Sequence, residues 1–262
     1  MSVVEVTRGN SPLVLGLPHT GTYVPESVLD CLNANGRALA DTDWHIHRLY
    51  DGLVDATTVR TTTHRYVIDA NRDPGGGSLY PGQNTTALCP TTDFDGRPIY
   101  REHQAPDADE IEARRIAHHA PYHAALTAEL DRAQAQFGFA VLYDCHSIRS
   151  RIPFLFDGRL PDLSIGTNGG ATCHAEVEAL VCAACDGAYG LTSVLNGRFR
   201  GGWTTRHYGC PQDGVHAIQM EIAQSTYLAE EAPPWPWDSA KADRLRVILR
   251  PLLQSLCDWR PS

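Results

Sequence analysis

The sequence has no apolar run that approaches the roughly 18 consecutive residues typical of a membrane-spanning helix. Its first residues, MSVVEVTRGNSP, lack the basic stretch and the apolar stretch of a secretory signal peptide. Clustered basic residues are also missing: the formal net charge is -9, and nearly all of the 22 Lys and Arg residues are Arg. These absences predict a cytoplasmic protein that binds neither a membrane nor nucleic acid.

Several motifs are absent as well. No serine lies in a G-x-S-x-G nucleophile elbow, and the pair Cys182 and Cys185 has no second CxxC at the spacing of a zinc ribbon. That pair lies in an Ala-rich helical pattern, so we interpret both as small helix residues and all eight cysteines as reduced thiols. No internal repeat or low-complexity linker divides the chain, which predicts a single catalytic domain, residues 1–262.

What the sequence does contain is an alternation of β-branched apolar runs with helix-like segments, together with twelve histidines. Such alternation predicts a three-layer α/β/α sandwich around a mixed, mostly parallel central sheet. Asp107 and Gly138 are suitable start and stop residues for the longest helix. The expected strands are 13–18, 60–70, 139–144 and 215–223, and the expected helices are 26–36, 43–56, 107–138, 171–190 and 239–259.

Each expected strand carries polar residues at or near its carboxyl end, where ligands bind in open α/β sheets. In chain order these are His19, Asn71 with Arg72, His146, and Glu221 within the fourth strand. Two imidazoles and one carboxylate form the ligand set of a catalytic zinc site. Zinc lowers the pKa of a bound water, and a nearby Glu can then act as general base. We therefore expect His19 and His146 to bind a metal ion.

The third ligand should be a carboxylate on the same face of the sheet. We favour Asp43, because a helix that begins there and packs on the sheet would direct its side chain inward. Asp41 lies close by in the same segment. His45 and His47 form an alternative ligand pair, although residues i and i+2 diverge on a helix.

A competing hypothesis is a nucleophilic enzyme that uses Cys145 or Ser147 beside His146. Adjacent residues of a strand point to opposite faces, so Cys145 and His146 should not meet. We interpret Cys145 as a core residue behind the site and keep a Cys-dependent amidase as the less favoured alternative.

Several segments together form a combination that is specific to one enzyme family. They are HTGTYVP, DTDWHIHRLYD, YVIDANR, LYPGQNTTALCPTTDFDGRPIY, YDCHSIRS, LFDGRLPDLSIGTNGGATC, NGRFRGGWTTRHYG and HAIQMEIAQSTY. Over nearly the whole chain they resemble N-formylglutamate amidohydrolase (N-formylglutamate deformylase), the last enzyme of one bacterial histidine-degradation route. That family is similar in fold to zinc carboxypeptidases, which implies a phosphorylase/hydrolase-like, carboxypeptidase-like α/β sandwich.

The resemblance also implies a role for each strand-end residue. His19 matches the first metal-binding His of the carboxypeptidase-like site, and His146 matches the last. Glu221 matches the general base in its apolar strand. Asn71 and Arg72 match the pair that binds the substrate's carboxylate.

One departure from carboxypeptidases concerns the third ligand. Their first metal-binding His is followed three residues later by a Glu ligand, whereas His19 is followed at that spacing by Thr22. The missing carboxylate must come from elsewhere in the chain, and Asp43 is the residue that the family pattern supports.

The substrate that the resemblance implies is N-formyl-L-glutamate, a small anionic N-acyl amino acid that is hydrolysed to formate and L-glutamate. Because it carries two carboxylates, an acidic protein must place arginines against it. A Gly-rich loop before the fourth strand supplies further substrate-binding candidates: Arg198, Arg200, Thr205 and Arg206.

In the expected mechanism, zinc-bound water attacks the formyl carbon with Glu221 as general base. The expected cofactor is Zn2+, with Co2+, Mn2+ or Ni2+ as alternatives, in a monomer or small homo-oligomer. Two further alternatives are the same chemistry on another N-acylated acidic amino acid, and a non-catalytic carboxylate-binding protein that kept the fold.

Overall fold

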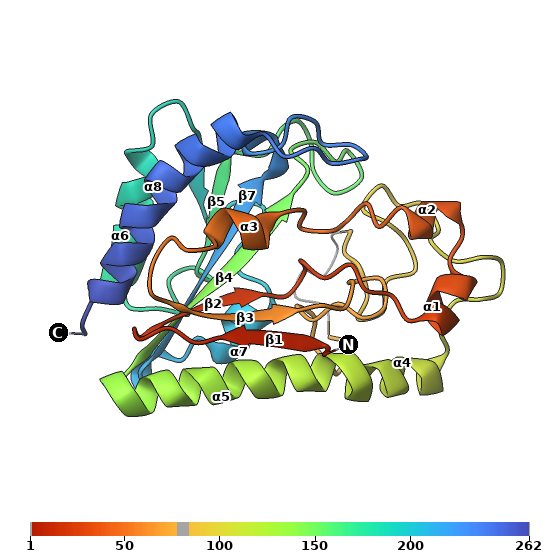
Figure 1. The fold of residues 1–262 in the computed structure, drawn as a ribbon, viewed down its shortest axis with the longest axis horizontal. Coiled ribbons are helices and arrows are strands. Elements are labelled where there is room, and N and C mark those ends of the chain that lie inside the picture. The colour runs from red at the N-terminus through yellow and green to blue at the C-terminus, as the bar shows by residue number, and fades with distance from the viewer. Residues whose placement is uncertain (1, 78–83, 262) are drawn as a thin grey trace.

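The structure is a computed structural model that describes residues 2–77 and 84–261. Over these residues the chain forms a mixed seven-stranded sheet with the order β1-β3-β2-β4-β7-β5-β6 (Figure 1). Four neighbouring pairs are parallel, whereas β1/β3 and β5/β7 are antiparallel. The strands are β1 (Val4–Thr7), β2 (Leu13–Leu17), β3 (Thr57–Thr61), β4 (Ala140–Ile148), β5 (Leu163–Gly166), β6 (Ser193–Leu195) and β7 (Val215–Ala223).

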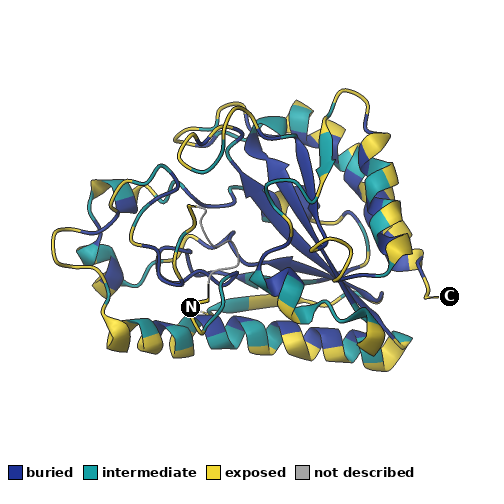
Figure 2. Ribbon diagram, turned by 180° about the vertical axis from the view of Figure 1, so that it is seen from behind, coloured by how far each residue is buried: buried dark blue, intermediate teal, exposed yellow. Residues whose placement is uncertain are grey.

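Helices cover both faces of this sheet and complete a three-layer sandwich (Figure 1). α5 (Ala120–Phe137) packs along one face, and α3 (Ile46–Tyr50), α6 (Ala175–Asp186) and α8 (Ser239–Asp258) pack on the other. Figure 2 shows that the central strands are buried while the helices expose their outer sides. The expected α/β fold class with a mixed, mostly parallel sheet is confirmed.

The two faces of the sheet have separate apolar cores, because alternate residues of a strand point to opposite sides. Leu142 of β4 and Ala217 of β7 pack under α5, whereas Cys145 packs in the core on the opposite face. His146 lies four residues after Leu142, and Glu221 lies four residues after Ala217, so the members of each pair point to the same face of the sheet. Both residues therefore face the α5 side, and they lie directly opposite each other in the β4–β7 register.

The strand predictions are confirmed for β2 and β7, and β4 is longer than expected. β4 continues to Ile148, so His146 lies inside the strand near its carboxyl end rather than at its tip. The prediction for 60–70 is wrong beyond Thr61, where β3 ends. Tyr66 is buried with Leu32, Ile99 and Tyr100, and Ile68 with Leu88 and Cys89. Packing against loops and short helices, not strand pairing, therefore explains their apolar character.

The long helix begins and ends as predicted. Asp107 accepts a hydrogen bond from the backbone N of Glu110 at 2.9 Å, and Gly138 closes the helix with a φ of 86°. Between these residues the chain forms α4 (Ala108–Arg114), a π-helical turn (Arg115–His119) and α5.

The first two predicted helices are shorter than expected. Residues 26–36 are divided between α1 (Glu26–Cys31) and α2 (Ala34–Arg37). In the range 43–56 only Ile46–Tyr50 is helical, because His45 immediately before it has a left-handed φ of 58°, which a helix cannot contain.

The sequence did not predict four short elements, namely β1, β5, β6 and α7 (Trp203–Tyr208). Each covers only three to six residues, too few to establish a strand or helix periodicity. Across residues 2–77 and 84–261, no helix is both long and apolar enough to cross a membrane.

Candidate active site

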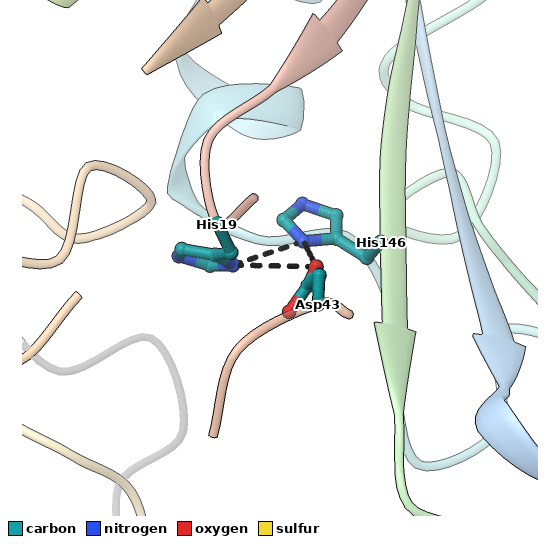
Figure 3. Close-up of side chains that lie close together, drawn as sticks. All are labelled: His19, Asp43 and His146. Carbon is teal, nitrogen blue, oxygen red and sulfur yellow. Dashed lines mark hydrogen bonds and ion pairs between the residues drawn. The ribbon is translucent and has the colours of Figure 1, made fainter. Parts of the chain in front are cut away.

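Three buried side chains from separate segments converge at the carboxyl ends of β2 and β4 (Figure 3). His19 follows β2, Asp43 lies in the loop before α3, and His146 belongs to β4. His146 Nδ1 lies 3.1 Å from His19 Nδ1 and 3.2 Å from Asp43 Oδ2, and His19 Nδ1 lies 3.7 Å from Asp43 Oδ2. Two imidazole nitrogens and one carboxylate oxygen therefore face a common point, as a three-ligand metal site requires.

Asp43 reaches this point through backbone contacts, not through a helix. Its backbone N donates to the carbonyl of His19 at 3.0 Å, and its Oδ2 accepts from the backbone N of Ser147 at 3.1 Å. The loop is thus tied to both histidine-bearing segments. The expectation that Asp43 starts a helix is wrong, since α3 begins three residues later.

The alternative ligands lie elsewhere. His45 Nε2 is 3.0 Å from the carbonyl of Trp235, and His47 lines a separate surface cavity beside Tyr50 and Arg60. Asp41 accepts from the hydroxyl of Tyr66 and the backbone N of Phe94, both at 2.8 Å.

Each metal-facing histidine has a carboxylate at its second ring nitrogen. His19 Nε2 lies 2.6 Å from Asp69 Oδ1, and His146 Nε2 lies 3.1 Å from Asp144 Oδ1. Metal-binding histidines almost always carry such a partner, because it orients the ring and increases the basicity of the coordinating nitrogen. Thr205 in turn donates its hydroxyl to Asp144 Oδ2 at 2.9 Å.

The charges at the three ligand atoms suit a cation. Burial opposes ionisation of Asp43, but hydrogen bonds from His146 and His19 outweigh it and hold the pKa of Asp43 well below its usual range. Arg65, itself buried, directs its guanidinium to this point: it contacts His19 Nδ1 and lies 3.8 Å from Asp43 Oδ1. Two imidazole nitrogens and one carboxylate oxygen, buried together, are a donor set that fits a divalent metal ion.

Glu221 lies beside the three ligands on the adjacent strand. It is buried opposite His146 in the β4–β7 register, and its Oε2 accepts from Gln219 Nε2 at 3.1 Å. Burial, opposed by His146 and reinforced by Asp43, raises the pKa of Glu221 to about 8. A carboxyl with a raised pKa next to a metal site is suited to accept and return a proton.

One cavity connects these groups. Among the described residues that line it are His19, Asp43, His146 and Glu221, together with Arg65, Asn71, Arg72 and Arg198. Three of the six expected substrate-binding residues, Asn71, Arg72 and Arg198, therefore face the same space as the metal ligands.

The other three expected substrate-binding residues are not among the described residues that line the cavity. Thr205 is fully buried behind His146, where its hydroxyl holds Asp144, which corrects its assignment from substrate contact to support. Arg206 Nε donates to the carbonyl of Gly201 at 2.8 Å, and the carbonyl of Arg200 accepts from the backbone N of Asn168 at 2.6 Å. Arg206 thus lies within α7, and Arg200 lies in the loop that precedes it.

The sequence analysis missed Arg65, Asp69 and Gln219. Asp69 and Arg65 lie in the segment that was expected to be a strand, where alternation would have placed them at ordinary sheet positions. Asp144 lies two residues before His146, and because such residues of a strand share a face, the two side chains come together.

Cys145 is placed as predicted, in the core on the far side of β4. Its Sγ donates to the carbonyl of Tyr143 at 3.4 Å, and burial raises the pKa of the thiol well above its ordinary value. A nucleophilic cysteine needs the opposite, a lowered pKa and access to substrate.

Comparison with known proteins identifies the family of this chain. The family model described as N-formylglutamate amidohydrolase matches residues 11–228. N-formylglutamate deformylase of Pseudomonas aeruginosa is 47% identical over 98% of this chain and 97% of its own length, and that of Pseudomonas putida is 44% identical over 98% and 96%. The chain belongs to the N-formylglutamate amidohydrolase family.

The solved structures agree with this membership. The crystal structure of N-formylglutamate amidohydrolase from Ralstonia eutropha JMP134 superposes with a TM-score of 0.81 at 25% identity, covering 98% of each chain. The His19–Asp43–His146 cluster, Glu221 and the cavity-lining arginines lie within the part matched by the family model, whereas α8 follows it. The resemblance noted in the sequence is therefore confirmed.

Proposed function

We propose that this chain hydrolyses N-formyl-L-glutamate to formate and L-glutamate with the help of a divalent metal ion. The observation that carries the proposal is the presence of Glu221 in the same buried cavity as the His19–Asp43–His146 cluster. Binding alone needs no general base, so this combination favours a hydrolase over a carboxylate-binding protein. The names of the two Pseudomonas relatives support the substrate.

The charges of the cavity suit a substrate with two carboxylates. Arg65, Arg72 and Arg198 line it together with the amide of Asn71. Arg72 and Arg198 are held by neighbouring loops: Arg72 donates to Thr86 through Nε and Nη2, both at 2.9 Å, and Arg198 donates to the carbonyls of Leu155 and Asn84. Pre-ordered arginines bind carboxylates without a large loss of side-chain freedom.

The residues around Glu221 support a simple proton path. Glu221 takes a proton from water as the water oxygen forms a bond to the formyl carbon, and it later gives that proton to the amine nitrogen as the C–N bond breaks. Gln219 fixes Glu221 by donating to Oε2. When bound, a divalent ion would supply the positive charge that lowers the pKa of the water and of Glu221 and polarises the formyl carbonyl.

The same proposal includes zinc as the metal, a cytoplasmic location and a role in histidine degradation. Two imidazoles and one carboxylate are a common ligand set for catalytic zinc. All eight cysteines are unpaired in the structure, which agrees with a reducing compartment.

The decisive assay measures formate release from N-formyl-L-glutamate, with and without a chelator. N-acetyl-L-glutamate and N-succinyl-L-glutamate test the acyl group, and N-formyl-L-aspartate tests the length of the acidic side chain. We expect the highest kcat/KM for N-formyl-L-glutamate and loss of activity with chelator that added zinc restores. A higher kcat/KM for one of the analogues would favour hydrolysis of another N-acylated acidic amino acid.

The Cys-dependent alternative has its own test, the variant Cys145→Ala. Because the thiol is buried on the far face of β4, we expect kcat/KM within about threefold of wild type and a loss of stability of about 1–2 kcal/mol from the lost packing. Thiol alkylation of the folded enzyme should leave turnover unchanged. Abolished turnover in folded, metal-containing Cys145→Ala protein would instead support a cysteine nucleophile.

A further inference from the structure

Two histidines of the long helix reach the Asn71–Arg72 segment from outside the cavity. His119 Nε2 lies 3.1 Å from the carbonyl of Arg72, and His123 Nε2 lies 2.8 Å from the carbonyl of Ala70. The two hydrogen bonds therefore bracket Asn71. Neither histidine is among the described residues that line the cavity.

His119 and His123 lie where a π-helical turn joins α5. Residues Arg115–His119 form the turn, and the backbone N of Ala120 bonds to the carbonyl of Arg115, five residues back. Pro121 follows at once and has no backbone N–H to donate, which disfavours a regular α-helical continuation. Because His119 and His123 are four residues apart on the helix, both rings point to the same segment, with centroids 4.4 Å apart.

Burial favours the neutral form of both rings. Burial lowers the pKa of His119, and burial lowers the pKa of His123 to about 3. A neutral ring that donates from Nε2 accepts at Nδ1, and His123 Nδ1 lies 3.0 Å from the hydroxyl of Tyr208. Trp203 packs edge-on against His123, with centroids 4.8 Å apart, so the ring is enclosed from the α7 side as well.

The side chain of Asn71 also has contacts of its own. Its Oδ1 accepts from the backbone N of Thr204 at 2.8 Å, and its Nδ2 lies 3.1 Å from His146 Nε2. A Cβ atom at Gly202 would overlap the Asn71 amide, so the backbone of that glycine packs directly on it. The N–H groups of Asn71 and Arg72 donate to Asp69, at 2.9 and 3.2 Å, whereas the carbonyls on either side of Asn71 face His119 and His123.

We propose that His119 and His123 are positioning residues, which act through the backbone of Ala70 and Arg72 to place Asn71 and Arg72 against a substrate carboxylate. This inference rests on the proposed function, since it assigns those two residues to substrate binding. The same segment touches the cluster, since the backbone N of Asn71 donates to Asp69 Oδ1 at 2.9 Å, so the test measures metal content beside KM.

The test compares two replacements at each position. His119→Leu and His123→Leu remove the donor, whereas His119→Gln and His123→Gln keep a side-chain N–H at similar reach. We expect each Leu variant to raise KM for N-formyl-L-glutamate about tenfold, equivalent to about 1.4 kcal/mol, with kcat within about threefold and metal content unchanged. The Gln variants should return KM to within about threefold of wild type. Calorimetry with L-glutamate should show the same weakening of Kd.

His118→Leu is the matched control, because His118 lies in the same π-helical turn but bonds Thr63 Oγ1 at 3.1 Å instead. Its KM should stay near the wild-type value. Tyr208→Phe removes the hydroxyl that bonds His123 Nδ1 and leaves both histidines in place. We expect it to raise KM about threefold. It provides an independent test where the Leu variants do not fold.

Unchanged KM in folded Leu variants, or in Tyr208→Phe where the Leu variants do not fold, would overturn the inference. So would a fall in kcat at constant KM, or an equal effect in His118→Leu. Failure of the wild-type enzyme to release formate would contradict the proposed function instead, so the two failures are distinguishable.

Discussion

The variant Glu221→Gln is expected to lower kcat for N-formyl-L-glutamate by about a thousandfold while the protein keeps its metal. Gln preserves the size and polarity of the side chain opposite His146 but cannot accept a proton from water. General-base catalysis contributes about a hundredfold to ten-thousandfold to a rate, which sets the expected range. The measurement is formate release together with metal analysis of the same preparation.

Glu102→Gln serves as the control, because Glu102 is exposed and is not among the described residues that line the cavity. Its kcat should equal that of wild type. Turnover near the wild-type rate in metal-containing Glu221→Gln protein would remove Glu221 from the role of base and point to another group in the cavity.

Glu221→Gln should also stabilise the folded, metal-free protein at pH values above 4.5. The pKa of Glu221 is raised from its ordinary value of 4.5 to about 8 in the folded state. Below pH 4.5 the carboxyl is protonated in both the folded and the unfolded state, so it has no effect on their balance. As pH rises from 4.5 to 8, only the unfolded state readily loses the proton, and the free energy of unfolding decreases.

The glutamine side chain has no proton to lose, so the variant avoids this pH-dependent decrease in the free energy of unfolding. The gain in the free energy of unfolding should therefore be near zero below pH 4.5 and should level off above pH 8. It is expected to reach a few kcal/mol, since each pKa unit is equivalent to about 1.4 kcal/mol. Chemical denaturation of chelator-treated wild type and variant at pH 4.5 and pH 8.5 measures it, and an equal difference at both pH values would contradict the assignment.

Replacing any one of the three ligands, as in His146→Ala, His19→Ala or Asp43→Asn, is expected to abolish stable metal binding. Loss of an outer partner of a metal-binding histidine weakens affinity or activity about 10- to 100-fold, so loss of a ligand itself should exceed a hundredfold. The metal content of purified protein and its kcat should fall together. Asp69→Asn and Asp144→Asn should show the intermediate effect.

The matched controls are His45→Ala and His47→Ala, two histidines from the same segment as Asp43. Because His45 bonds the carbonyl of Trp235 and His47 lines another cavity, both variants should retain metal. Undiminished metal in His146→Ala, or metal loss in His45→Ala, would show that the ligand set differs from His19–Asp43–His146.

The sequence predicted correctly the side-chain orientation of residues that lie within a single strand. His146 and Glu221 follow from the alternation of β4 and β7, and the opposite orientation of Cys145 follows from the same rule. The failure at residues 62–70 has a definite cause. Tyr66 and Ile68 are as apolar as strand residues, but they pack against loops and the short helices α1 and α4. A single sequence does not show which partner buries an apolar side chain.

The approach of Asp43 to the histidines was anticipated for a reason that the structure does not support. It depends on hydrogen bonds to the backbone at His19 and Ser147, which lie 24 and 104 residues away in the chain. In the same way, Thr205 was expected to contact the substrate and instead holds Asp144 from behind, because α7 packs on that side of β4 and β7.

By itself, the sequence determined the α/β class, the strands that carry His146 and Glu221, the burial of Cys145 and the family. These properties depend on local periodicity and on motifs that are contiguous in the chain. Only the tertiary structure decided how Asp43 reaches His19 and His146, which of the arginines line the cavity, and that Asp69 and Asp144 lie beside the two imidazoles. Those properties are distances between segments far apart in sequence, and packing of the whole domain fixes them.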